Sequence, residues 1–113
     1  MQSKEWEIWL ADFEFEDMPG SKRRPVLIVP DGGGGLVKIK MTGSPCRDFL
    51  EHSIVNWEFA GLSKPTTIRT AKMSPLVSSD LIHKIGMLHQ DDITVFKLKL
   101  AAQIDLYTAN NIT

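Results

Sequence analysis

Two groups of basic side chains are the residues of this sequence best suited to chemistry. Three stand in a row before a proline, and two alternate with apolar residues further on: Lys22, Arg23, Arg24, Lys38 and Lys40. An arginine guanidinium can bind two phosphate oxygens as a fork, which a lysine ammonium cannot. Together these residues could form the local basic strip that a phosphate backbone requires. Taken alone, each is equally consistent with a solvated charge on a strand.

The other reactive residue types have no spacing that assigns them a role. His52, His83 and His89 lack metal-ligand spacing, and the single cysteine, Cys46, does not complete a site. The four glycines at 32–35 lack the lysine and the following helix of a phosphate-binding loop, which favours a hairpin connection. We therefore expect neither a metal nor a cofactor.

Length and composition are those of a small globular protein. The chain has 113 residues and a mass of 12.7 kDa, which predicts one domain spanning 1–113. A lone cysteine suits a reducing cytoplasm, and we expect no signal peptide and no membrane span. The formal net charge is −1, so any attraction to a nucleic acid must come from local patches.

The elements that must position these residues are mostly strands. Alternating or continuous apolar patterns predict strands at about 5–13, 25–29, 37–41 and 66–73. In the 37–41 strand, Lys38 and Lys40 should form a basic, solvent-facing side. The segment 48–55 fits a strand or irregular structure equally well.

Helices are expected towards the end of the chain. Asn56 and Gly61 predict one helical turn between them, with the asparagine as N-cap and the glycine as the stop. A helix is predicted from Ser78 or Ser79 to His89, and another from 91 or 92 to about 106, where a strand remains open. The fold class is α+β: a small antiparallel SH3-like β-barrel with a short helical turn and C-terminal helices packed against it.

Five segments, in one order along the chain, resemble the MazF/PemK-like toxins. The most recognisable is Arg-Pro-Val-Leu-Ile-Val at 24–29, and Gly-Leu-Ser-Lys-Pro-Thr-Thr-Ile-Arg at 61–69 resembles a second family segment. The others are Glu-Ile-Trp-Leu-Ala-Asp-Phe at 7–13, Met-Thr-Gly-Ser at 41–44 and Ile-Gly-Met-Leu at 85–88.

The resemblance implies a function as well as a fold. It implies a homodimeric, metal-independent endoribonuclease that cuts single-stranded RNA at short sequences, using the ribose 2′-hydroxyl as nucleophile. It also implies a cognate antitoxin whose disordered tail binds the same surface, and DNA binding together with that antitoxin.

By the same resemblance, Arg24, Thr42 and Arg69 match catalytic positions of the family. Arg24 would contact the scissile phosphate, Thr42 would donate a hydrogen bond to the developing charge, and Arg69 would act as a proton donor. Ser44 and Trp57 join the basic strip as candidate RNA-binding residues. Read from the sequence alone, Thr42 is equally consistent with a turn residue that bonds its own backbone.

The acidic residues of the family pattern are missing. Ala71 stands where some relatives have a carboxylate after the arginine, and Met18 and Pro19 stand where some have an acid or a histidine. Glu16 and Asp17 are possible substitutes. The alternative is therefore a catalytically degenerate member that acts as a protein- or nucleic-acid-binding module.

Overall fold

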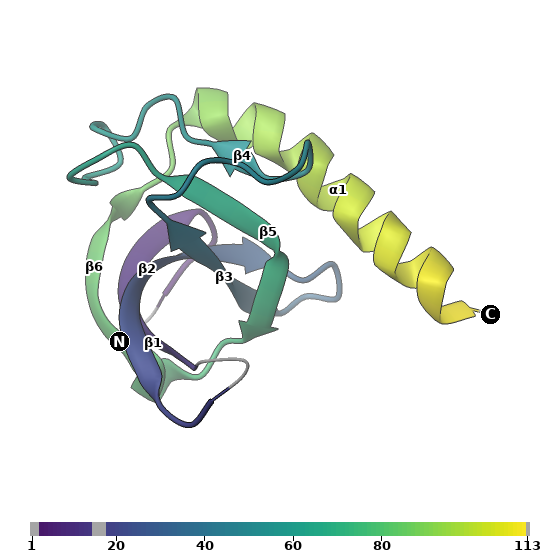
Figure 1. Ribbon diagram of the computed structural model, residues 1–113, viewed down its shortest axis with the longest axis horizontal. Helices are drawn as coiled ribbons and strands as arrows, with labels where there is room; N and C mark the ends of the chain where they lie inside the picture. The colour runs from purple at the N-terminus through teal and green to yellow at the C-terminus, as the bar shows by residue number, and fades with distance from the viewer. Residues whose placement is uncertain (1–2, 15–17, 113) are drawn as a thin grey trace.

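One antiparallel sheet of six strands, curled round on itself, makes up most of the fold (Figure 1). The computed structural model describes residues 3–14 and 18–112. The strand order is β4-β5-β3-β2-β1-β6, so β4 and β6 are the two edges of the described sheet. The strands are β1 (Glu7–Glu14), β2 (Ser21–Pro30), β3 (Leu36–Thr42), β4 (His52–Ser53), β5 (Thr67–Pro75) and β6 (Leu81–Met87).

A single helix, α1 (Gln90–Ile112), crosses the sheet after β6, and its C-terminal end projects away from the strands (Figure 1). The α+β fold with its antiparallel sheet confirms the predicted class, as do the four predicted strands and the helix start near Asp91. The strand alternative for residues 91–106 is wrong. The segment is helical, with Ile93, Phe96 and Leu100 buried at helical spacing and Leu98 exposed on the outer face.

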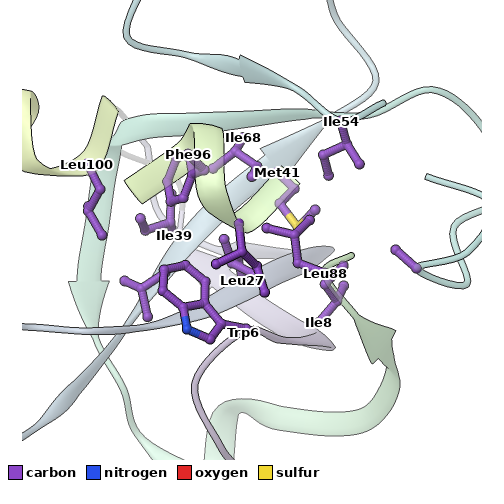
Figure 2. Packing of buried hydrophobic residues seen from close by; sticks show 13 residues of the cluster. Trp6, Ile8, Leu27, Ile39, Met41, Ile54, Ile68, Leu88, Phe96 and Leu100 are labelled. Carbon is purple, nitrogen blue, oxygen red and sulfur yellow. The ribbon is translucent and has the colours of Figure 1, made fainter. Parts of the chain in front are cut away.

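The main core lies between α1 and one face of the sheet. Figure 2 shows Phe96 and Leu100 of α1 above Leu27 of β2 and Ile39 of β3. Trp6, just before β1, meets Phe96 edge-to-face at a centroid distance of 6.4 Å, an arrangement that aromatic pairs favour. This core fixes the helix on the sheet.

The opposite face of the sheet has a smaller apolar cluster. It is formed by Trp9, Ala11, Val26, Ile28 and Leu81, all buried. Because side chains alternate along a strand, β2 supplies both clusters: its even-numbered residues to this one and its odd-numbered residues to the main core. The continuous apolar run of β2 is thus explained by burial on both faces.

The predicted helix from Ser78 or Ser79 to His89 is wrong. Ser78–Asp80 forms one short 3-10 turn, and the rest is strand β6, paired with β1. The pairing shifts register twice, which inserts extra residues into β6. Such bulges break strict alternation, so Leu81 packs into the smaller cluster on one face of the sheet and Ile85 against the main core on the other. The spacing of the apolar residues Leu81, Ile85 and Leu88 in the sequence nevertheless imitates a helix.

The predicted helical turn at 56–61 is present, and it packs closely on β6. The Ala60 amide donates to the Asn56 carbonyl at 3.1 Å, and Gly61 has a φ of 86°. A Cβ added to Gly86 would lie 2.2 Å from the Ala60 carbonyl oxygen, so only glycine allows this approach. The side-chain nitrogen of Asn56, the predicted N-cap, donates to Asp92 Oδ2 at 3.2 Å.

The glycine-rich connection between β2 and β3 is an ordered hairpin. The Asp31 carboxylate accepts hydrogen bonds from the Gly33 and Gly35 amides at 2.7 and 3.0 Å. Gly32 and Gly34 adopt φ values of 87° and 89°, which other residues rarely adopt. The glycines therefore serve the turn, as the sequence predicts.

Candidate active site

Arg24 and Thr42 lie on the same face of the sheet. Val26 of β2 pairs with Lys40 of β3, and paired residues point to the same side. Every second side chain of a strand points to the same side. Arg24, two residues before Val26, and Thr42, two residues after Lys40, therefore also point there. Both residues are partly exposed.

Strand β5 adds Arg69 to this face. Thr42 pairs with Thr67, and Arg69 follows Thr67 by two residues, so its side chain has the same direction. The three predicted catalytic residues come from three adjacent strands and share one face of the sheet. Unlike the other two, Arg69 is buried, with 8% of its surface exposed.

The guanidinium of Arg69 is bound by a carboxylate that sequence reasoning did not identify. Its Nη1 donates to Glu51 Oε1 and to the carbonyl oxygen of Pro45, the latter at 3.3 Å. Glu51 is itself only 3% exposed. Its second oxygen, Oε2, accepts hydrogen bonds from Arg47 Nε and Nη2 at 3.3 and 3.2 Å. One carboxylate therefore lies between two arginines.

Glu51 remains ionised at neutral pH. Burial by itself would raise the pKa of its carboxyl, because the charged form loses water. The hydrogen bonds from the Arg47 amide and from the two guanidinium groups act in the opposite direction and prevail, so the pKa lies below its ordinary value. The Arg47–Glu51–Arg69 group thus carries a net positive charge.

The loop after β3 brings a further cation to this region. The Ser44 amide donates to Thr42 Oγ1 at 3.3 Å, so Thr42 does bond its own turn. That contact uses the oxygen as acceptor and leaves the hydroxyl hydrogen available to donate. A Cβ on Gly43 would lie 3.0 Å from Lys64 Nζ, which places this ammonium against the loop. Ser44 is exposed beside it.

The predicted basic strip is only partly exposed. Lys22 and Arg23 are exposed, and Arg23 Nε lies 4.0 Å from Asp12. The expectation of a solvent-facing side at Lys38 is wrong: the residue is 5% exposed, and its Nζ lies 3.1 Å from Asp80 Oδ2. The turn before β6 covers this end of the strand, whereas Lys40, nearer Thr42, is half-buried.

The remaining candidates lie elsewhere. Trp57 is half-buried and packs against the main core. His83 is exposed on β6 rather than on a helix, and His89 meets Phe59 edge-to-face at 4.7 Å. Cys46 is exposed in the loop that precedes Arg47. Glu16 and Asp17 lie outside the described residues. Within 3–14 and 18–112, no group of three or more histidines, cysteines and acidic residues could hold a metal ion.

The short strand β4 is held by α1 through a second buried polar group. Asp92 accepts hydrogen bonds from the amides of Val55 and Asn56, from the Asn56 side chain and from His52 Nε2, all at 2.9–3.2 Å. Lys99 Nζ lies 3.4 Å from His52 Nδ1 and donates to the Glu51 carbonyl at 3.0 Å. Because an ammonium only donates, Nδ1 accepts and Nε2 carries the proton given to Asp92.

Three solved structures share this architecture. An endoribonuclease from a mycobacterial species in complex with its cognate antitoxin matches with a TM-score of 0.70 at 14% identity, over 93% of this chain and 97% of its own. The Mycobacterium tuberculosis toxin MazF-mt6 matches with a TM-score of 0.67 at 18% identity, over 88% and 96%. A further mycobacterial endoribonuclease gives 0.70 at 12% identity, over 93% and 94%.

The chain has the MazF toxin fold. This confirms the fold expected from the five motifs. No protein-family model and no curated protein matches the sequence, so the likeness rests on the arrangement of the elements. Among the residues that the structure describes, no helix is long and apolar enough to cross a membrane.

The Asp92 contacts make a prediction about stability. Desolvation alone would raise the pKa of Asp92, but the hydrogen bonds from Val55, His52 and Asn56 prevail and lower it. Asp92→Asn should therefore reduce the free energy of unfolding by roughly 3 kcal/mol at neutral pH. A lowered native pKa stabilises the fold above the unfolded pKa of about 4, and this is lost as pH falls through the native pKa. The deficit of the variant should therefore shrink on acidification.

Urea unfolding followed by circular dichroism at several pH values measures this effect. Asp91→Asn is the matched control, since its carboxylate is 83% exposed one residue earlier in the same helix turn. The control should change the free energy of unfolding by no more than an exposed charge near a helix N-terminus contributes. Equal losses for the two variants would contradict the structural role of Asp92.

Proposed function

We propose that this chain is the toxin of a toxin–antitoxin pair and cleaves single-stranded RNA without a metal ion. The observation that carries the proposal is the common sheet face of Arg24, Thr42 and Arg69, on a fold shared with mycobacterial endoribonucleases. We further propose that the whole chain is one domain acting in the cytoplasm, where RNA is present.

The chemistry follows from these side chains. Attack by a ribose 2′-hydroxyl on the adjacent phosphate forms a 2′,3′-cyclic phosphate and expels the 5′-oxygen, which leaves as a hydroxyl once protonated. The phosphorane that forms during the attack carries more negative charge than the phosphate of the substrate. Arg24 can bind two of its oxygens as a fork, Thr42 can donate its hydroxyl hydrogen, and the guanidinium of Arg69 adds positive charge.

The surroundings of the three residues suit a polyanion. Lys22, Arg23, Arg47 and Lys64 add cations along one end of the sheet, and Arg47 and Lys64 were not predicted from the sequence. Because nearby charges dominate the field at a surface, this patch can attract RNA although the net charge is −1. It would equally suit the acidic tail of an antitoxin, bound in competition with RNA.

We also propose a homodimer, supported by the outer face of α1. Val95, Leu98, Ala102 and Leu106 are exposed at a spacing that places them on one side of the helix, away from Phe96. Leu98 is 73% exposed, which is unusual for so large an apolar side chain in a stripe of this kind. A two-fold symmetric contact would cover it.

The first test is cleavage itself. We expect the purified protein to cut a single-stranded RNA of mixed sequence in the presence of a chelator, since the proposed mechanism uses protein side chains alone. The products should carry 2′,3′-cyclic phosphate and 5′-hydroxyl ends. Products with 5′-phosphate ends, or activity abolished by the chelator, would indicate metal-activated water instead. A folded protein that binds RNA without cutting it would favour the binding-module alternative.

The second test concerns Arg24. Arg24→Lys keeps the charge but removes the fork, so it should lower kcat nearly as much as Arg24→Ala, by on the order of 10²–10³. Arg23→Ala is the matched control, because this neighbour points to the other side of β2. The control should weaken RNA affinity in a salt-dependent way and leave kcat nearly unchanged. Near-normal cleavage by folded Arg24→Ala would remove Arg24 from the mechanism.

The third test concerns assembly. Leu98→Glu places a charge in the middle of the exposed stripe and should convert the dimer to a 12.7 kDa monomer in sedimentation velocity at micromolar concentration. Lys97→Glu, one residue earlier and on a different side of α1, is the control and should remain dimeric. A wild-type protein that sediments as a monomer would contradict the proposal.

A further inference from the structure

The Glu51 carboxylate is the negative charge nearest the predicted catalytic arginine Arg69. It lies in the chain immediately before β4, and the β4–β5 pairing of His52 with Ile68 brings it beside Arg69. We propose that Glu51 is a positioning residue of the site, which orients the guanidinium groups of Arg69 and Arg47 toward a phosphate of the RNA. This inference rests on the proposed function.

The two carboxylate oxygens of Glu51 bind the guanidinium groups of the two arginines separately. Oε1 accepts from Arg69 Nη1 and from the Arg47 backbone amide, the latter at 2.7 Å, and Oε2 accepts from the Arg47 side chain. Contacts through two guanidinium nitrogens restrain the plane of Arg47 as well as its distance. Arg69 Nη1 also donates to the Pro45 carbonyl oxygen, which restrains this guanidinium further.

Glu51, Arg69 and Arg47 differ in how far they are exposed to solvent. Glu51 and Arg69 are buried, whereas the Arg47 side chain is 57% exposed. Glu51 binds only part of the Arg47 guanidinium. The rest faces solvent beside the loop that contains Ser44. A flexible arginine held in this way loses less conformational entropy when it binds phosphate.

Glu51 is not well placed to be a general base. Both of its oxygens already accept hydrogen bonds, and a carboxylate whose pKa is lowered accepts a proton poorly. The hydrogen bonds that its carboxylate accepts come from Arg47 and Arg69. The carboxylate therefore acts through these arginines.

The experiment compares Glu51→Gln with Glu7→Gln. Glu7 is also a buried glutamate with a lysine partner, Lys84 at 2.8 Å, but it lies at the start of β1, four residues before Ala11, which pairs with Arg24. Both variants lose one negative charge. Glu51→Gln loses ion pairs with two arginines and Glu7→Gln an ion pair with one lysine, so we expect both to lower the melting temperature. Cleavage of mixed single-stranded RNA is measured at a temperature where both are folded.

We expect Glu51→Gln to lower kcat by on the order of 10², since small misplacements of catalytic groups have effects of this size. Glu7→Gln should stay within about threefold of wild type, and Glu51→Asp should recover part of the loss because it keeps the charge. In an Arg69→Gln background, Glu51→Gln should lower kcat much less, because the two residues act as a unit. Equal rates for Glu51→Gln and Glu7→Gln would overturn the proposal.

A binding measurement separates this inference from the proposed function. Affinity for a 2′-O-methyl RNA of mixed sequence, which cannot be cleaved, is measured against salt concentration. Glu51→Gln should bind about tenfold more weakly than Glu7→Gln despite an identical net charge. If wild type binds RNA without cleaving it, the proposed function fails, and this comparison alone decides the role of Glu51. If wild type neither cleaves nor binds RNA, both proposals fail.

Discussion

The carboxylate of Asp92 is the contact on which the candidate site depends. Strand β4 has two residues, too few for its pairing with β5 to hold it in place. Asp92 accepts four hydrogen bonds from β4 and the turn after it, and Lys99 adds a contact with the Glu51 carbonyl. The main core fixes α1, α1 fixes β4, and β4 fixes the carboxylate that holds two arginines.

The division of one sheet face into two halves explains how a chain with a net charge of −1 can have a basic site. Trp9, Val26 and Ile28 fill one half, and the turn before β6 covers it and pairs with Lys38. On the half that β3, β5 and the neighbouring loops form, basic side chains outnumber the one buried carboxylate, Glu51. Away from this half, Asp80 and Glu7 form ion pairs with Lys38 and Lys84.

The sequence was informative where one periodicity continues along an element. The apolar run of β2, the alternation in β3 and β5 and the helical pattern after Asp91 predicted those elements, and the family motifs located Arg24, Thr42 and Arg69. Strand β6 was mistaken for a helix because Leu81, Ile85 and Leu88 are apolar at helical spacing, whereas the two register shifts place Leu81 and Ile85 on opposite faces of the sheet. Burial of Lys38 depends on Asp80, 42 residues later, which no local pattern indicates.

Glu51 shows a different limit of reasoning from motifs. The resemblance to the family would place an acidic residue two positions after Arg69, where the chain has Ala71. In a sheet, however, the neighbours of a side chain include residues on the adjacent strand, which here lie 18 positions away along the chain. A carboxylate can therefore reach the same guanidinium from the next strand while the local motif changes. A charge pair constrains the positions of two groups in space rather than their spacing in the sequence, so a local motif does not reveal it.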